Sequence, residues 1–207
     1  MGSKHLNQPR ALLSATDKHG IDVFAQNLLD MNWEVYATSG TKAYCDERGV
    51  NVKCLSELIG SNPTLNGRLK TLDARLLGGL LWDRRNAQHN KDAETLELFP
   101  FDILVSSFYN FELMKDKGLD DEKLVDFIDV GGPAMLRASA KNYHTVLPVV
   151  DKEDYQRIIC RLQDLNGDPQ KMPLLERKNL ARKAFNYTLA YDQAISNYFS
   201  INTEVAK

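Results

Sequence analysis

The first 55 residues repeat one pattern, in which a short apolar run is followed by a polar turn and by apolar residues at helical spacing. The runs 10–15 (RALLSA) and 33–38 (WEVYAT) predict strands, and the stretches 21–29 and 42–48 predict helices. A third strand is predicted over 50–55. Strands that alternate with helices require right-handed crossovers, which produce a parallel sheet covered on both faces. The sequence therefore predicts a doubly wound α/β fold.

The remainder of the chain continues with strands and helices around one long irregular segment. Residues 60–79 are rich in glycine and basic side chains, and a long loop of this kind inside a compact domain is usually functional. The further predicted strands are 102–108 and 145–150, and the further predicted helices are 120–127, 134–142, 153–165 and 174–199. Residues 129–133 predict a tight turn, and Pro133 suits the first turn of the helix that follows.

We expect a single domain over 10–200, with an α/β core over 10–150 and a helical extension over 151–200. The extension ends in a helical pattern that contains neither glycine nor proline. The apolar residues expected to form its buried stripe are Leu180, Ala184, Phe185, Leu189 and Ile195. Because burial of such a stripe stabilises a fold, we expect this helix to be an integral part of the domain.

Composition excludes several classes of protein. Of the 207 residues, 43% are hydrophobic and 26% are charged, which is typical of a chain that buries a core and not of a disordered one. The length excludes an enzyme with two full catalytic domains. The formal net charge of -2 provides no field that would attract nucleic acid or an anionic membrane. Local groups must therefore hold any anionic ligand.

The sequence shows no targeting or metal-binding pattern. The N-terminal residues MGSKHLNQPR lack an apolar signal core, and the apolar stretches are far shorter than the roughly 20 residues that span a bilayer. The three cysteines form no CxxC pair and the four histidines form no HxxxH pair. We expect a soluble cytoplasmic protein with reduced thiols and no bound metal.

Candidate binding residues lie in loops that follow the predicted strands. In parallel α/β sheets, ligands bind outside the carboxyl ends of the strands. Residues 14–18 and 38–41 place hydroxyls, backbone amides and a lysine at helix N-termini, which suits a phosphate, although Ser, Thr and Asp also serve as simple N-caps. The basic loop 68–71 and the turn 129–133 complete the set. Arg137 and Lys141 share a helix face, which is also typical of a solvated surface.

The chain resembles the IMP cyclohydrolase domain, which forms the N-terminal half of a bifunctional enzyme with AICAR transformylase. The resemblance covers roughly residues 10–200, and it rests on the blocks SATDK (14–18), TSGT (38–41), LNGRLKTL (65–72), GGLL (78–81), IDVGGP (128–133), LRASAKN (136–142), KAFNY (183–187) and ISNYF (195–199). It implies a methylglyoxal-synthase-like fold of three layers, α-β-α, with a parallel sheet and the C-terminal helical extension.

The resemblance also implies an activity. The domain closes the ring of 5-formamido-AICAR ribotide (FAICAR) to give IMP and water, in de novo purine biosynthesis, with no cofactor and commonly as a homodimer. A separate formyltransferase would then supply the substrate.

The resemblance assigns roles residue by residue. The residues implied to bind the phosphate are Thr16, Lys18, Thr38, Ser39, Gly40 and Thr41. Those implied to bind the rest of the substrate are Arg68, Thr71, Ser107, Val130 and Gly131. The implied catalytic residues are Lys70, Tyr109, Asp129 and Lys141.

The chemistry of ring closure requires both a carboxylate and a cation. The carboxamide nitrogen is a poor nucleophile, so it must lose a proton as it attacks the formyl carbon, and the formyl oxygen must leave as water. Asp129 is the candidate that accepts or orients the amide proton, while Lys70, Tyr109 or Lys141 donates toward the oxygen. Since the reaction is intramolecular, much of its acceleration comes from holding the two groups close together.

The chain departs from the family near the expected base pocket. Where the family reads KTLHPxxHGG, residues 70–79 read KTLDARLLGG, and where it reads NLYPF, residues 107–111 read SFYNF. The phosphate loops are kept. Two explanations stay open: a paralogue that closes the ring of a related formamido-ribotide in a specialised pathway, or drift around an unchanged site. A non-catalytic purine-nucleotide-binding regulatory module and a methylglyoxal synthase are further alternatives.

Overall fold

The computed structural model describes residues 8–60, 69, 71–115, 118 and 120–204. Its centre is a five-stranded parallel sheet in the order β3-β2-β1-β4-β5. The strands are β1 (Arg10–Ser14), β2 (Glu34–Ala37), β3 (Lys53–Cys54), β4 (Ile103–Ser106) and β5 (Leu147–Val149). The order runs outward from β1 in both directions, so the chain reverses its winding between β1 and β4, where ligand sites of doubly wound sheets form.

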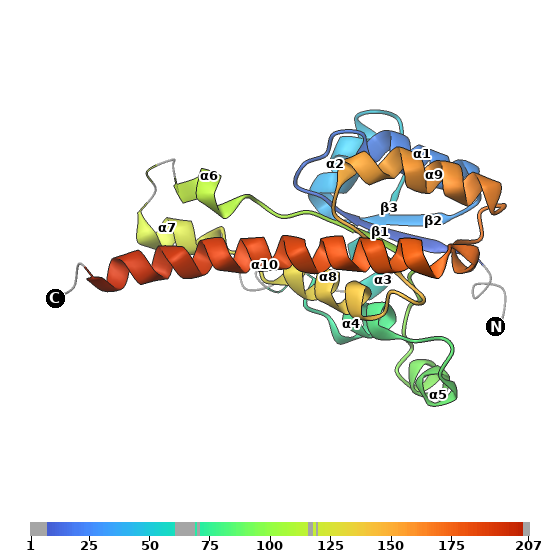
Figure 1. Ribbon diagram of the computed structural model, residues 1–207. Helices are drawn as coiled ribbons and strands as arrows, with labels where there is room; N and C mark the ends of the chain where they lie inside the picture. The colour runs from blue at the N-terminus through green and yellow to red at the C-terminus, as the bar shows by residue number, and fades with distance from the viewer. Residues whose placement is uncertain (1–7, 61–68, 70, 116–117, 119, 205–207) are drawn as a thin grey trace.

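Helices cover both faces of this sheet (Figure 1). One face carries α1 (Ile21–Asp30), α2 (Ser39–Asp46) and α9 (Tyr155–Asp164), and the other carries α3 (Leu55–Ile59), α4 (Ala74–Leu81), α8 (Gly131–Lys141) and α10 (Leu174–Glu204). Three short helices lie outside these layers or at their margin: α5 (Ala87–Thr95), α6 (Phe111–Lys115) and α7 (Asp121–Asp126). The predicted three-layer α-β-α fold is confirmed.

The strands divide their side chains between two cores. Leu13 and Val105 pack with α1 and α9, whereas Leu12, Tyr36 and Leu104 pack with α8 and α10. This alternation follows from the two-residue period of a strand. It also explains why the strands appear in the sequence as continuous apolar runs, because both faces of a parallel sheet are buried.

The predicted irregular segment 60–79 contains a helix, so that interpretation was wrong for its second half. Helix α4 begins after Asp73, whose carboxylate accepts hydrogen bonds from the amides of Arg75 (2.9 Å) and Leu76 (3.0 Å). An Asp that receives two amides in this way is a strong N-cap. Other boundaries also differ: α2 begins at Ser39, β3 has only two residues, and α5 was not predicted.

Helix α10 lies across the lower face of the sheet and extends past it to α6 and α7 (Figure 1). Its buried stripe follows the helical period along one face and consists of Arg177, Leu180, Ala181, Ala184, Thr188, Tyr191 and Tyr198. The prediction was right for Leu180 and Ala184, and Ile195 is half-buried. It was wrong for Phe185 and Leu189, which are 40% and 66% exposed because each lies one position off this stripe.

Polar side chains fix this helix at the amino edge of the sheet. Asp102 accepts hydrogen bonds from the backbone of Arg10 (2.9 Å) and from the side chains of Arg84 (2.8 Å) and Gln170 (3.0 Å). The buried Arg177 guanidinium donates to the carbonyls of Met172 and Tyr143, both at 3.1 Å. The two buried charged groups, Asp102 and Arg177, are thereby paired, as burial requires.

We expect Gly79→Ala to destabilise the protein by about 1–3 kcal/mol, the usual cost of overpacking. A Cβ atom at this position in α4 would lie 1.9 Å from the backbone oxygen of Phe99, which cannot rotate away as a side chain can. Thermal melts measure the effect. Gly40→Ala is the matched control, since nothing lies within 4 Å of its added Cβ. Equal melting temperatures for the two variants would contradict the prediction.

Candidate functional site

The loops after β1 and β2 are joined at the carboxyl edge of the sheet. The amide of Ala15 donates to Thr41 Oγ1 (3.2 Å), and the same hydroxyl donates to the Ala15 carbonyl (3.3 Å). The amide of Thr38 donates to the Leu13 carbonyl (3.0 Å). The buried Thr41 is therefore a structural bridge between the two predicted phosphate loops.

The N-terminus of α2 presents groups that suit an anion. Its first amides have no partner inside the helix, and the positive end of the helix dipole lies there. Thr38 precedes the helix without a side-chain capping bond, and Ser39 and Gly40 are exposed. The Lys18 ammonium lies 3.4 Å from the Thr16 carbonyl.

A third loop, after β4, is tied to the first. The amide of Thr16 donates to Ser107 Oγ (3.0 Å), and the Thr16 hydroxyl donates to the Ser107 carbonyl (3.1 Å). Because β1 and β4 are neighbours at the reversal of the winding, these two loops border the place where a ligand is expected. The Ser107 hydroxyl is thus engaged with the loop that is predicted to bind phosphate.

The turn before α8 brings Asp129 and Thr71 to the same pair of glycines. The amide of Gly132 donates to Asp129 Oδ1 (3.0 Å). A Cβ atom on Gly131 would lie 2.1 Å from Thr71 Oγ1, and one on Gly132 would lie 2.5 Å from Asp129 Oδ2. Only glycine permits this approach. Among the described residues, Oδ1 is the Asp129 oxygen for which a hydrogen bond is found.

The remaining residues predicted for the site differ in exposure and in their position relative to the turn before α8. Tyr109 is about half exposed and contacts Phe127, with the ring centroids 6.1 Å apart, and Val130 is exposed. Lys141 is exposed at the last turn of α8, about 15 Å along the helix from Gly131 at 1.5 Å per residue. Arg68 and Lys70 lie outside the described residues.

Two tyrosines of α10 reach these loops and were not predicted as site residues. The amide of Asp129 donates to the Tyr191 hydroxyl (2.8 Å). The Tyr187 hydroxyl donates to the Phe108 carbonyl (3.2 Å) and accepts from the Phe108 amide (3.4 Å). Burial raises the pKa of both tyrosines, so they stay protonated at neutral pH. The available signal was their spacing of four, which places them on one helix face.

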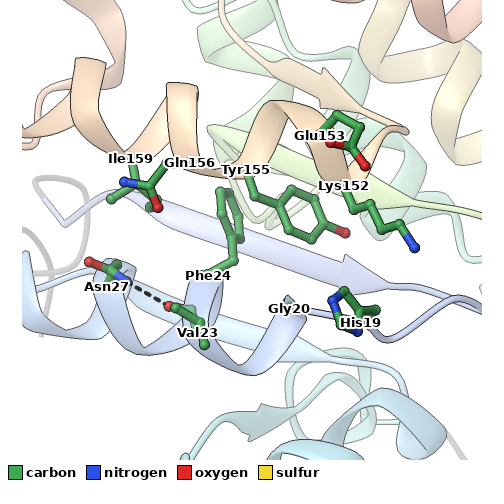
Figure 2. A pocket seen from close by; sticks show the side chains of 10 residues that line it. All are labelled: His19, Gly20, Val23, Phe24, Asn27, Lys152, Glu153, Tyr155, Gln156 and Ile159. Carbon is green, nitrogen blue, oxygen red and sulfur yellow. Dashed lines mark hydrogen bonds between the residues drawn. The ribbon is translucent and has the colours of Figure 1, made fainter.

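A separate groove lies on the outer helical layer between α1 and α9 (Figure 2). Phe24, Tyr155 and Ile159 line it, together with polar side chains that include His19 and Lys152, and no residue of the predicted site is among the described residues that line it. The Lys152 ammonium is paired with Asp17 at 2.9 Å.

In the described part of the chain, no three His, Cys, Asp or Glu side chains gather as a metal site would require. No helix of that part is long and apolar enough to cross a membrane.

The parallel sheet, covered by helices on both faces, matches the fold of known families. A family model described as MGS-like domain matches residues 20–134, and the chain belongs to this MGS-like family. A second model, described as AICARFT/IMPCHase bienzyme, matches residues 139–207. The predicted fold class and the predicted family resemblance are both confirmed.

Individual relatives narrow the relationship to the IMP cyclohydrolase half of a bifunctional enzyme. The bifunctional purine biosynthesis protein PurH of Macrococcus caseolyticus is 40% identical over 199 residues, covering 96% of this chain and 39% of PurH. PurH of Brucella anthropi is 42% identical over 212 residues, covering 99% of this chain and 39% of PurH. The chain therefore spans about two fifths of the length of these relatives.

A solved structure matches nearly the whole fold. The crystal structure of ForH superposes with a TM-score of 0.80 at 31% identity, covering 93% of this chain and 99% of the ForH chain. The similarity includes at least half of α10, because a match of 93% cannot leave out most of a helix of 31 residues.

Proposed function

We propose that this protein is a ribotide cyclohydrolase of purine biosynthesis that closes FAICAR to IMP with loss of water. The observation that carries the proposal is the turn before α8, where Asp129 and Thr71 meet at Gly131 and Gly132. The similarity to PurH over almost the whole chain supports the assignment of this turn to ring closure.

The proposed reaction uses two ends of one site. The amides of Ser39 and Gly40, with Lys18 and Thr16, hold the ribotide phosphate. The Asp129 carboxylate accepts or orients the carboxamide proton as the nitrogen forms a bond to the formyl carbon. Tyr109 or Lys70 donates one proton to the formyl oxygen. The formamido nitrogen then loses its proton and forms the C=N bond of the ring, while the bond between carbon and the former formyl oxygen breaks and water leaves with its second proton. Lys141 stays a prediction, because its position at the far end of α8 gives it no contact with Asp129 in a single chain.

Ring closure by the purified protein tests this proposal. FAICAR is mixed with enzyme, and formation of the purine ring is followed by ultraviolet absorbance against a protein-free control. Closure that depends on enzyme concentration supports the proposal. If IMP binds but FAICAR does not close, the site is a nucleotide site with a different role.

A related formamido-ribotide is the second candidate substrate. The observation that favours it concerns Ser107, which stands where the family carries an asparagine. Its hydroxyl accepts a hydrogen bond from the backbone N–H of Thr16. Asp73, which also departs from the family pattern, has a simpler explanation, because its carboxylate caps the N-terminus of α4. A ribotide with an altered base ring that closes faster than FAICAR would favour this candidate.

We expect the protein to bind IMP far more tightly than inosine. Charge-assisted hydrogen bonds contribute about 1.5–3 kcal/mol each, and the nucleoside loses all of those made to the phosphate. Titration calorimetry with the two ligands measures the difference. Equal affinities would remove Thr16, Lys18 and residues 38–41 from phosphate binding.

Partners follow from the same proposal. Cyclisation consumes a formylated amine, so a separate formyltransferase supplies the substrate. We also propose a homodimer, for which the exposed Phe185 and Leu189 of α10 offer an apolar surface. The three free cysteines fit a reducing compartment such as the cytoplasm.

A further inference from the structure

Helix α10 holds the backbone of two loops that carry candidate catalytic residues. Tyr191 accepts the Asp129 amide at 2.8 Å, and Tyr187 makes two hydrogen bonds to the backbone of Phe108, the neighbour of Tyr109. The Asp129 amide precedes α8 and has no place in its hydrogen-bond ladder, so it needs a partner from elsewhere.

The same tyrosines enclose Phe108. Its ring centroid lies 4.6 Å from the centroids of both Tyr187 and Tyr191, with tilted or edge-on geometry. Phe108 also limits the turn of Asp129, since a Cβ atom on Gly132 would lie 3.0 Å from its ring. Phe108 is 4% exposed and Tyr191 is 7% exposed. The loop after β4, the turn before α8 and α10 are therefore packed as one cluster.

We propose that Tyr187 and Tyr191 are positioning residues, which set the loops of Tyr109 and Asp129 at the separation that ring closure requires. This inference rests on the proposed function, and neither tyrosine touches the reacting atoms. The intramolecular reaction depends on placement more than on the number of chemical groups, and a misplacement of about 1 Å can cost about 100-fold in rate. A hydroxyl that fixes a catalytic backbone therefore acts on the turnover number.

Substitutions that remove only a hydroxyl test the proposal. Tyr191→Phe and Tyr187→Phe keep the rings that pack on Phe108. We expect each to lower kcat roughly tenfold, with KM within about twofold, because the phosphate loops that bind the ribotide are unchanged. Tyr198→Phe is the matched control. Tyr198 lies near the far end of the same helix, and its hydroxyl contacts Asp121 of α7.

A second measurement does not depend on activity. Hydrogen exchange of the Asp129 amide should accelerate in Tyr191→Phe and not in Tyr198→Phe. If the parent protein fails to close FAICAR while this exchange still responds, the proposed function fails and the positioning contact stands. Unchanged Asp129 exchange with unchanged kcat in Tyr191→Phe would overturn the inference, as would equal losses of kcat and melting temperature in all three variants.

Discussion

Asp129→Asn is expected to reduce ring closure by at least about 100-fold, the size of effect when one acid-base group is removed. The amide retains an oxygen that can accept the Gly132 amide, so the turn before α8 keeps its hydrogen bond of 3.0 Å. It cannot take up the carboxamide proton as a carboxylate does. We therefore expect normal melting together with a large loss of rate, measured by ultraviolet absorbance on the ribotide that the parent accepts.

A control substitution at Asp168 separates the catalytic effect of Asp129→Asn from the effect of altering a capping carboxylate. Asp168 accepts the amide of Gln170 at 2.9 Å, as Asp129 accepts that of Gly132, but it lies at the opposite edge of the sheet. Asp168→Asn should leave turnover unchanged. Asp129→Ala should add a cost of about 1 kcal/mol in stability, because the capping oxygen is lost. Turnover by Asp129→Asn within about threefold of the parent would remove Asp129 from the mechanism.

Removal of the residues after 173 is expected to unfold the protein. This truncation deletes Leu180, Tyr191 and Tyr198 from the buried stripe and exposes the part of the lower core that α10 covers. Each large side chain contributes about 1.5–3 kcal/mol on burial, and the sum approaches the 5–15 kcal/mol that a whole domain has. Circular dichroism and thermal melts should show a chain without a cooperative transition.

A shorter truncation serves as the control. Removal of the residues after 199 keeps the whole buried stripe of α10 through Tyr198, and it should change the melting temperature by a few degrees at most. A chain that ends at 173, stays soluble and melts as the parent does would show that α10 is a detachable tail.

The sequence predicted the features that depend on local pattern. Apolar runs identified the five strands, and the loops predicted to bind phosphate each directly follow a strand. The cap of α4 is visible in the sequence as Asp73, but the pair Gly78 and Gly79 inside the helix favours a loop. The contacts of Tyr187 and Tyr191 cannot be predicted from local pattern, because they are tertiary contacts with Phe108 and Asp129, which lie more than 60 residues away.

The attachment of α10 at both edges of the sheet fixes the number of residues between its contacts. Arg177 is held at the amino edge, and Tyr187 and Tyr191 meet the loops at the carboxyl edge. One residue inserted between positions 178 and 186 would rotate both tyrosines by about 100° around the helix axis and move them about 1.5 Å along it. Both hydroxyls would then leave their partners together. Substitutions can accumulate on the exposed face of this segment. A change in its length, in contrast, would break the hydrogen bonds that hold the two loops of the candidate site.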